Sequence, residues 1–398
     1  MKKKNKCLIC NKKFLEYLNL GYHPCADTFI NRKIDSLKLK KYPLVVGFCK
    51  CNHLTSIYNI SPYERYKKNN YSYTSDNSPV SKKHFDDISK KIFKNFLINN
   101  NKSVIEIGSN DGTFLKNIKK YANCKVLGID PSNNMCKLAL KKKISSLNIF
   151  FNYKNSKIIK NNHGKFDVLY GANVFNHVDD PINFLKGCKN IVKESGNIIL
   201  EVPDLNSLIK SVGFDTIYHE HRHYFSRQST LKLFEKVNLN LIKIDKIEYM
   251  AGSLRIYSKN EPYKKNMKYK FNYQGQKKKF FNFKNKIFSV KKKIIEFVRN
   301  NSFNRKIVIG LGAATKGNTL LNFCNLDYND INCVLDNSPH KIGKFMPGSG
   351  IKILDETKFK KYDAALILPW NITKHLYKKF LKNRKISYTS IAKIVKDL

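Results

Sequence analysis

The sequence predicts a chain of the α/β class, with a small cysteine-bearing head followed by two domains in which strands alternate with helices. Three observations predict this fold. An apolar strand that runs into a glycine turn and then a helix occurs at 103–120, and a second unit of this kind occurs at 306–321. Two close cysteine pairs precede both units. Because a strand–turn–helix unit of this type surrounds a ligand with backbone N–H groups, both domains are candidates for ligand binding.

Length and composition indicate a globular protein of two or three domains. The chain has 398 residues, of which 42% are hydrophobic and 12% aromatic, and it can bury a sizeable core. It contains no apolar run long enough to span a bilayer, and its N-terminus lacks the apolar stretch of a signal peptide. We therefore expect a cytoplasmic protein with no membrane partner.

The formal net charge of +45 raises the question of a nucleic-acid partner. Only 8 of the 75 basic residues are Arg, and the lysines are spread from end to end. Proteins that read nucleic acids favour arginine at specific contacts and gather their charge on one face. The excess of Lys, Asn and Ile is instead typical of an AT-rich genome, so we expect no nucleic-acid partner. The charge still favours an anionic substrate.

The head contains four cysteines that could meet in one place. They form two close pairs: Cys7, Cys10, Cys49 and Cys51. Four thiolates suit a tetrahedral zinc ion, and a segment this small needs such a cross-link. Four protein ligands leave no open position, so the expected zinc is structural rather than catalytic. His53 is an alternative to Cys51 as the fourth ligand, and Cys25 could also compete.

The first strand–turn–helix unit has an acidic character. The strand 103–107 runs into a glycine turn, a helix follows at 113–120, and a second strand, 125–129, ends in an aspartate suited to hold ribose hydroxyls. Glu106 and Asp111 would repel a pyrophosphate, but they suit a ligand with a cationic sulfonium and an amino group. The sequence therefore favours S-adenosylmethionine (SAM) over a dinucleotide. The candidate cofactor residues are Glu106, Gly108, Ser109, Asn110, Asp111, Gly112, Asp130 and, after a later strand, Asn173.

The rest of the central domain continues the alternation and ends with two strands. The expected strands are 166–170, 197–202, 240–250 and 253–258, with helices at 181–193 and 230–237. This order is the one expected of a class I methyltransferase. Active sites in such sheets lie beyond the C-terminal ends of the strands. Asn173, Asn176 and His177 lie at one strand end, and the segment after Asp204 lies at the next.

That segment concentrates polar side chains. It reads Tyr218-His219-Glu220-His221-Arg222-His223-Tyr224-Phe225. We expect no strand around it to align the three histidine rings on one face, which favours acid–base chemistry over a metal site. A loop with solvated histidines is the alternative reading, although loops at strand ends are where function concentrates.

The last part of the chain begins with a connector and continues as a second nucleotide-type fold. Residues 260–300 are predicted to be helical and to pack against both halves. The second strand–turn–helix unit starts at 306–312, and further strands are expected at 331–335 and 364–368. Lys316, near the start of the helix, could hold phosphate groups. A scaffold domain with no ligand of its own is the alternative.

Several motifs in order resemble those of the sugar C-methyltransferases of deoxysugar biosynthesis, which act on nucleotide-linked 4-keto-6-deoxy sugars. The resemblance covers nearly the whole chain. It is carried by the cysteine head, Tyr71-Ser72-Tyr73, the turn Glu106 to Gly112, Asn173 to His177, Tyr218 to His221, Gly252 to Arg255, Gly310 to Leu321, Asp336, Pro347-Gly348 and Leu368 to Asn371. The second cysteine pair is one residue shorter than that family's usual C-x-x-C, which leaves the fourth ligand open between Cys51 and His53.

The resemblance implies three domains and two cofactors. They are a zinc-binding domain at 1–70, a Rossmann-like SAM-dependent methyltransferase domain at 71–262, and a Rossmann-like domain at 263–398 that binds the sugar nucleotide. The cofactors are SAM and a structural zinc ion. The expected partner is a nucleotide-sugar substrate, and the expected state is a monomer or small homo-oligomer.

The resemblance also implies a mechanism and site residues. A base removes the acidic hydrogen beside the ketone, and the enolate carbon attacks the sulfonium methyl. His221 is the expected base, because imidazole is a usable base near neutral pH. Glu220 would orient or polarise it, and Tyr218 and His177 would hydrogen-bond the enolate oxygen. The residues expected to bind the substrate are Tyr71, Tyr73, Arg255, Lys316 and Asn318.

Three other functions remain as alternatives. An O- or N-methyltransferase on a related sugar nucleotide would keep the central domain but would need no acidic carbon. A basic RNA-binding or RNA-modifying methyltransferase would bind RNA with a steep dependence on salt. A scaffold that binds the cofactor without turnover is the third.

Overall fold

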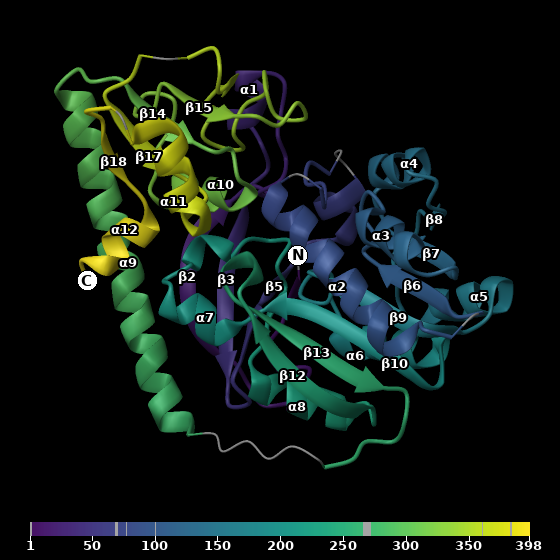
Figure 1. Ribbon diagram of the computed structural model, residues 1–398. Coiled ribbons are helices and arrows are strands. Elements are labelled where there is room, and N and C mark those ends of the chain that lie inside the picture. The colour runs from purple at the N-terminus through teal and green to yellow at the C-terminus, as the bar shows by residue number, and fades with distance from the viewer. Residues whose placement is uncertain are drawn as a thin grey trace.

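The computed structural model describes residues 2–67, 71–76, 78–99, 101–265, 272–359, 361–382 and 384–398. Its strands form three large sheets and a small pair (Figure 1). The central domain lies beside an N-terminal sheet, and a second α/β domain lies beyond that sheet, flanked by one long helix (Figure 1). None of the helices in the described ranges has the length and apolar character that crossing a bilayer requires.

The central sheet has seven strands in the order β12-β13-β10-β9-β6-β7-β8. They are β6 (Ser103–Ile107), β7 (Lys125–Ile129), β8 (Ser146–Leu147), β9 (Phe166–Ala172), β10 (Val192–Pro203), β12 (Asn240–Ile247) and β13 (Ser253–Lys259). All strands are parallel except β13, which runs antiparallel to both of its neighbours. Because the first strand lies in the middle of the sheet, the chain reverses its direction of winding beside β6, and ligands bind at such a point. This strand order is that of a class I methyltransferase.

Helices cover both faces of this sheet, because its strands alternate apolar side chains up and down. Val104 packs with α2 and α3 on one face, whereas Ile105 packs with α5, α6 and α8 on the other. The helices of the domain are α2 (Pro79–Phe96), α3 (Thr113–Tyr121), α4 (Asn133–Lys141), α5 (Tyr153–His163), α6 (Pro181–Ile191), α7 (Leu205–Lys210) and α8 (Arg227–Lys236). A short 3₁₀ turn, η2 (Phe214–Thr216), follows α7.

The N-terminal sheet is antiparallel and takes its last strand from the central domain. Its order is β11-β4-β3-β2, from β2 (Leu15–His23), β3 (Tyr42–Cys49), β4 (His53–Ser56) and β11 (His223–Tyr224). We expected no strand in the histidine-rich segment, and this expectation was wrong, since His223 pairs with Thr55 and Tyr224 with Leu54. The head also contains α1 (Lys33–Leu37), the π-helix η1 (Tyr63–Lys67) and the pair β1 (Lys2–Lys3) with β5 (Tyr58–Asn59).

The C-terminal sheet is fully parallel, with the order β16-β15-β14-β17-β18. Its strands are β14 (Val308–Leu311), β15 (Cys333–Asp336), β16 (Ile353–Asp355), β17 (Ala364–Ile367) and β18 (Ser387–Thr389). Its helical segments are α10 (Thr315–Phe323), η4 (Trp370–Ile372), α11 (Thr373–Leu376), the π-helix η5 (Tyr377–Leu381) and α12 (Ile391–Lys396). The first strand again lies in the middle, so α10 begins at the ligand-binding edge.

The predicted connector is the long helix α9 (Tyr273–Phe303), which flanks the molecule in Figure 1. It buries a side chain every three or four residues, which is the spacing of one helix face. At one end Phe280 packs on Tyr17 and Phe48 of the N-terminal sheet, and further along Val298 joins the core of the C-terminal domain. The helix therefore packs against both the N-terminal sheet and the C-terminal domain. The domain boundaries at 70/71 and 262/263 stay our proposal, and residue 70 itself lies outside the described residues.

Candidate functional site

The glycine turn after β6 is shaped by its backbone. Gly108 has a φ of +72° and Gly112 a φ of +74°, and a Cβ atom at Gly108 would lie 2.9 Å from the side chain of Val174. Such positive φ angles favour glycine. Ser109 donates its backbone N–H to the carbonyl of Ile129, which ties the turn to the end of β7.

Asn110 holds a second segment over the turn. Its amide donates to the carbonyl oxygen of Tyr73 at 3.0 Å and accepts from the N–H of Ser75 at 3.0 Å. Tyr71 is held by Asn134, whose amide donates to the Tyr71 carbonyl at 2.8 Å. The structure thus brings the predicted tyrosine segment and the predicted cofactor turn together.

Three carboxylates gather beneath this turn: those of Glu106, Asp111 and Asp130. Burial, reinforced by the other two carboxylates, raises the pKa of Glu106 well above its usual range. Burial also raises the pKa of Asp130 to about 6, although this carboxylate accepts N–H groups from Ser132 at 2.8 Å and Asn110 at 2.9 Å. Asp111 has a cationic partner in Lys142, at 2.8 Å.

Glu106 makes the site suited to a cationic ligand. Its Oε2 is buried and has no hydrogen-bond partner among the described residues. A buried carboxylate without a partner is costly, and a ligand cation would relieve that cost. The residues present therefore fit SAM, which carries a sulfonium and an ammonium group and no phosphate. Asn173, with a φ of +52° and its N–H bonded to the Glu201 carbonyl, stands at the end of β9 on the same edge of the sheet.

His221 is held in one tautomer. Its Nδ1 lies 2.8 Å from the carbonyl oxygen of Thr216, and because a carbonyl only accepts, Nδ1 carries the proton. Nε2 then has a free lone pair, to which the Tyr218 hydroxyl donates at 2.7 Å. Burial lowers the pKa of His221 to about 4, so the ring is neutral at physiological pH.

His177 lies beside this pair. Its ring centroid is 4.8 Å from that of His221, and its Nδ1 is 2.6 Å from the Tyr66 hydroxyl. The backbone brings these residues together, since the carbonyl of Asn176 accepts the N–H groups of Arg222 and His223. Three of the predicted catalytic side chains, those of Tyr218, His221 and His177, are therefore neighbours.

Glu220 has a partner other than His221. Its Oε1 accepts the backbone N–H of Asp27 at 3.2 Å, whereas Oε2 is buried with no hydrogen-bond partner among the described residues. Burial raises the pKa of Glu220 to about 7, with the Asp27 carboxylate adding to the effect. The group that orients the imidazole in this structure is the Thr216 carbonyl.

The start of α10 reaches the same region from the C-terminal domain. Lys316 donates to Asn371 and lies 4.6 Å over the ring of Trp370, and its charge also lowers the pKa of His221. Asn318 is buried and donates to the carbonyl of Ala26 at 2.6 Å. Lys316 is thus close to the proposed base, and Asn318 contacts the head.

Arg255 is placed apart from Lys316 and Asn318. It lies in β13, and its Nε donates to Oε1 of Glu201 at 2.6 Å. The other oxygen of Glu201 is 2.7 Å from Nε2 of His84, whose ring stacks on Tyr249. Tyr73 joins this group through its hydroxyl, 3.3 Å from that of Tyr249. Arg255 is therefore one partner of a buried ion pair in the central sheet, and Tyr73 lies beside that pair.

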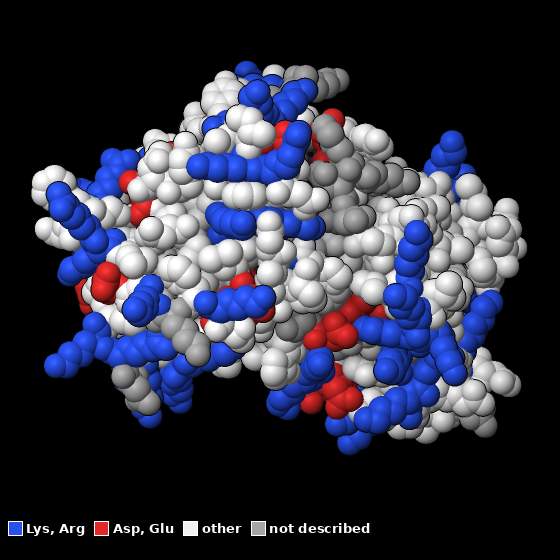
Figure 2. Space-filling model, turned by 90° about the horizontal axis from the view of Figure 1, so that it is seen from above, with Lys and Arg blue, Asp and Glu red and all other residues white. Residues whose placement is uncertain are grey.

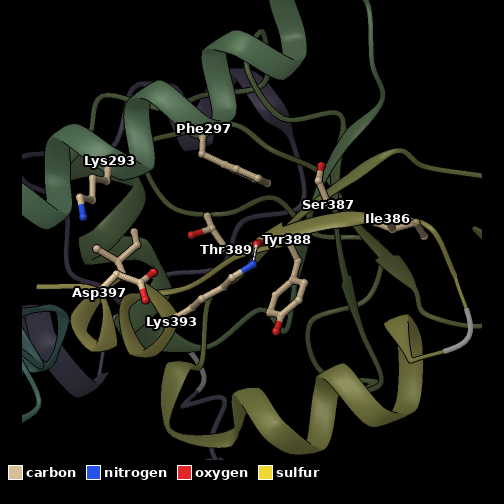
Figure 3. Close-up of a pocket in the computed structure, with 9 residues that line it drawn as sticks. Lys293, Phe297, Ile386, Ser387, Tyr388, Thr389, Lys393 and Asp397 are labelled. Carbon is tan, nitrogen blue, oxygen red and sulfur yellow. Dashed lines mark hydrogen bonds between the residues drawn. The ribbon is translucent and has the colours of Figure 1, made fainter.

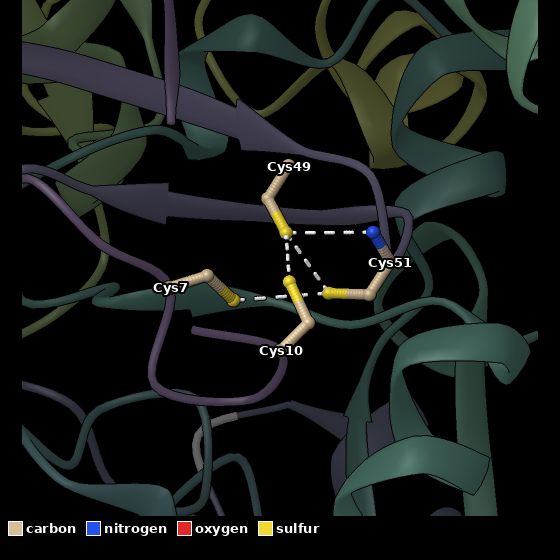
Figure 4. A group of neighbouring side chains, drawn as sticks. All are labelled: Cys7, Cys10, Cys49 and Cys51. Carbon is tan, nitrogen blue, oxygen red and sulfur yellow. Dashed lines mark hydrogen bonds between the residues drawn. The ribbon is translucent and has the colours of Figure 1, made fainter. Parts of the chain in front are cut away.

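The four cysteines of the head meet in one cluster (Figure 4). The Sγ atoms of Cys7, Cys10, Cys49 and Cys51 all lie within 4.8 Å of one another. Ligands of a tetrahedral zinc ion with Zn–S bonds of about 2.3 Å are separated by about 3.8 Å. Cys7 lies 3.7 Å from Cys51, whereas Cys49 lies closer, 3.0 Å from Cys51 and 3.1 Å from Cys10. The cluster therefore could hold a metal. His53 is not one of these four ligands, although its Nδ1 lies 3.7 Å from the Cys7 sulfur; its Nε2 lies 3.2 Å from Nδ1 of His223.

Two features of the surface lie apart from these groups. A pocket of about 400 Å³ is lined by α9, β18 and α12, and it contains none of the predicted site residues (Figure 3). On the face drawn in Figure 2, Lys and Arg side chains are spread among uncharged ones, with small groups of Asp and Glu. Neither the pocket nor the charge distribution on this face indicates a role in methyl transfer.

Sequence reasoning missed three residues that hold this region together. Asp27 accepts from Ser72 and from Thr315 at 2.8 Å, Tyr66 bonds His177, and Asp215 accepts the indole N–H of Trp370. These partners are far apart in the chain. No local spacing could have paired them.

Two family models match parts of this chain. Residues 81–244 match the family described as methyltransferase domain, and residues 251–391 match the C-methyltransferase C-terminal domain. The chain is 27% identical to C-methyltransferase NovU of Streptomyces niveus, over 95% of this chain and 93% of that protein. It is also 22% identical to a ubiquinone biosynthesis O-methyltransferase of Coxiella burnetii, over 37% of this chain and 68% of that protein.

Solved structures with some likeness include a SAM-dependent methyltransferase from Archaeoglobus fulgidus, with a TM-score of 0.36, 17% identity and coverage of 45% of this chain and 94% of that one. The fold assignment depends on the strand order of the central sheet and on the matched domains. With these matches, the seven-stranded core and the four-cysteine cluster, the chain belongs to the C-methyltransferase family and is a SAM-dependent enzyme.

Proposed function

We propose that the enzyme methylates a carbon beside the ketone of a nucleotide-linked 4-keto-6-deoxy sugar. The observation that carries this proposal is the state of His221, a neutral imidazole whose Nδ1 proton is fixed on the Thr216 carbonyl. Transfer to carbon requires the acceptor carbon to lose a proton, and a neutral Nε2 is able to take it. Transfer to a hydroxyl or amine places no such demand on the site.

In the proposed mechanism Nε2 of His221 removes the hydrogen beside the ketone, and the electrons of that C–H bond form an enolate. The Tyr218 hydroxyl, which donates to Nε2 in the free protein, turns to the developing enolate oxygen and stabilises it. His177 lies against the His221 ring and is the second group near that oxygen. When bound, SAM supplies an electrophilic methyl group to the enolate carbon.

The cofactor is proposed to lie along the edge formed by β6, β7 and β9. Glu106 would face its cationic part, and Asp130 the ribose hydroxyls. The turn 108–112 would approach it with backbone groups, and Asn173 would close the other side. Tyr71 and Tyr73 are held over the same turn by Asn134 and Asn110, which supports a role for this segment where cofactor and substrate meet.

The C-terminal domain is proposed to hold the nucleotide diphosphate. Lys316 lies at the start of α10, where a helix N-terminus favours anions. Burial lowers the pKa of Lys316, and a bound diphosphate would raise it again. Asn318 and Arg255 remain proposed substrate residues. We further propose that the four cysteines hold a structural zinc ion, because this donor set and its spacing suit tetrahedral zinc.

A panel of 4-keto-6-deoxy sugar nucleotides, incubated with the enzyme and SAM and followed by mass spectrometry, tests the proposal. The substrate is expected to gain one methylene and to lose a deuterium placed beside the ketone. Gain of mass with that deuterium retained would show transfer to oxygen or nitrogen. Methylation of RNA, with no sugar product, would overturn the proposed substrate class.

The role of His221 is tested separately. His221→Gln is expected to lower kcat by about 10²–10⁴-fold, with SAM affinity unchanged because the ring is not part of the proposed cofactor site. Near-normal turnover would remove His221 as the base.

A further inference from the structure

The proposed base is connected to the C-terminal domain through η2. Asp215, within η2, is fully buried, and its Oδ1 accepts a hydrogen bond from Nε1 of Trp370 at 2.8 Å. The next residue, Thr216, is the one whose carbonyl oxygen binds Nδ1 of His221 at 2.8 Å. Trp370 follows β17, so a side chain of the C-terminal domain fixes the backbone that orients His221.

Packing holds η2 against the C-terminal domain on two sides. A Cβ atom at Gly213 would lie 2.8 Å from Cζ2 of Trp370, so the ring is packed directly on the backbone before Asp215. The ring of Phe214 meets that of Phe323 in α10, with centroids 5.3 Å apart. The position of Thr216 therefore depends on both contacts.

Charge adds to this coupling. The indole of Trp370 lies between two ionisable groups, with Nζ of Lys316 4.6 Å from its ring centroid and the Asp215 carboxylate on its N–H. Burial raises the pKa of Asp215 to about 6, and the nearby Lys316 and the indole N–H partly offset this effect. Oδ2 of Asp215 has no hydrogen-bond partner among the described residues. Among those residues, the side chain that donates to the Asp215 carboxylate is therefore the indole of Trp370.

We propose that Trp370 is a positioning residue, which holds His221 in its Nδ1–H tautomer through Asp215 and Thr216. This inference rests on the proposed function, in which Nε2 of His221 is the base. Without the indole N–H, the Asp215 carboxylate loses its side-chain hydrogen bond to the C-terminal domain, and the Thr216 carbonyl shifts relative to Nδ1 of His221. The ring then samples the opposite tautomer, whose protonated Nε2 is unable to accept the substrate proton.

Nitrogen-15 NMR of histidine side chains in the full-length protein tests this directly and needs no substrate. The His221 signals are assigned by their loss in His221→Gln. Trp370→Phe keeps the aromatic ring and removes the N–H, and the ratio of the two His221 tautomers is expected to change by about fivefold or more. Thr357→Val is the matched control, because it removes a hydroxyl hydrogen bond to Asp355 elsewhere in the C-terminal domain and leaves Trp370 and Lys316 in place; its tautomer ratio is expected to equal that of the wild type.

Gly213→Ala provides an independent route if Trp370→Phe fails to fold. The added methyl pushes the ring away from Asp215 and is expected to shift the tautomer ratio in the same direction. An unchanged ratio in whichever of these variants is folded would overturn the inference. Failure of the proposed function gives a different result from failure of this inference. It appears as normal C-methylation by His221→Gln, independent of the tautomer ratio in the other variants.

Discussion

The carboxylate of Asp27 accepts a hydrogen bond of 2.8 Å from the hydroxyl of Thr315, and this contact joins the N-terminal head to the first turn of α10. The same carboxylate accepts the N–H and hydroxyl of Ser72, at 2.9 and 2.6 Å. The backbone N–H of Asp27 donates to Glu220. One residue of the head therefore contacts the C-terminal domain, the tyrosine segment and the proposed catalytic segment.

Thr315→Val is expected to weaken the junction, because valine keeps the shape of threonine and removes the hydroxyl. The free energy of unfolding should fall by about 1.5–3 kcal/mol, the range for a hydrogen bond to a charged group. Urea unfolding followed by tryptophan fluorescence measures it, since the chain has a single Trp. Thr357→Val, which loses a solvent-exposed hydroxyl contact to Asp355 within the C-terminal domain, is the control and should lose less. Equal stability of the two variants would contradict the bridging role of Thr315.

Glu106→Gln is expected to weaken SAM binding by about tenfold or more, since the charged form contributes the strength of such a contact. Titration calorimetry measures the affinity. Asp167→Asn is the matched control, because Asp167 is an acid on the neighbouring strand β9 that bonds Ser103 and Lys193. If both variants bind SAM as the wild type does, the proposed cofactor site is wrong.

The pH dependence of SAM binding follows from the same carboxylates. The pKa of Glu106 is raised well above its usual range and that of Asp130 to about 6, so protonation of these groups competes with SAM binding as the pH falls. A cationic ligand favours their ionised forms. SAM affinity should therefore rise with pH through 6, with protons released on binding, which calorimetry in buffers of different ionisation enthalpy detects. Affinity that is flat across this range would show that neither acid faces the cofactor.

His219 predicts a change in acid stability. Its side chain is buried, and burial lowers its pKa to about 3. The unfolded value is about 6.5, so the folded state is penalised as pH falls below that value. His219→Phe should therefore gain about 2 kcal/mol relative to the wild type between pH 8 and pH 5. Urea unfolding at the two pH values checks this, and a difference that does not change with pH would contradict it.

The cysteine cluster predicts one zinc ion per chain. Cys51→Ser is expected to lose the metal and to lower the Tm, because structural zinc contributes directly to folding. His53→Ala should keep the metal, since His53 lies outside the cluster of four sulfurs. Elemental analysis with thermal unfolding measures both. Zinc retained in Cys51→Ser and lost in His53→Ala would make His53 the fourth ligand.

Much of the fold could be predicted from the sequence, because its main elements have strong local signals. The strands at 103–107 and 125–129 lie where their apolar residues and the turns that follow predicted them. The start of helix α2, at Pro79 behind the N-cap of Ser78, was not among the predicted elements. The first turns of α2 carry few apolar residues, so their periodicity was too weak to predict a helix there.

The site was predictable only in part. Local motifs identified the glycine turn, the histidine segment and the cysteine pairs. The strand His223–Tyr224 could not be predicted, because it exists only by pairing with β4 in the distant head. The contacts of Asp27, Asp215 and Trp370 depend in the same way on tertiary packing, so their partners were not readable from spacing.

The most direct test of the account uses SAM with a carbon-13 methyl group and a uniformly carbon-13-labelled 4-keto-6-deoxy sugar nucleotide. If a carbon beside the ketone is the acceptor, the product methyl signal shows one-bond coupling to a ring carbon in its NMR spectrum. A methyl signal without such coupling, attached to oxygen or nitrogen, would contradict the account.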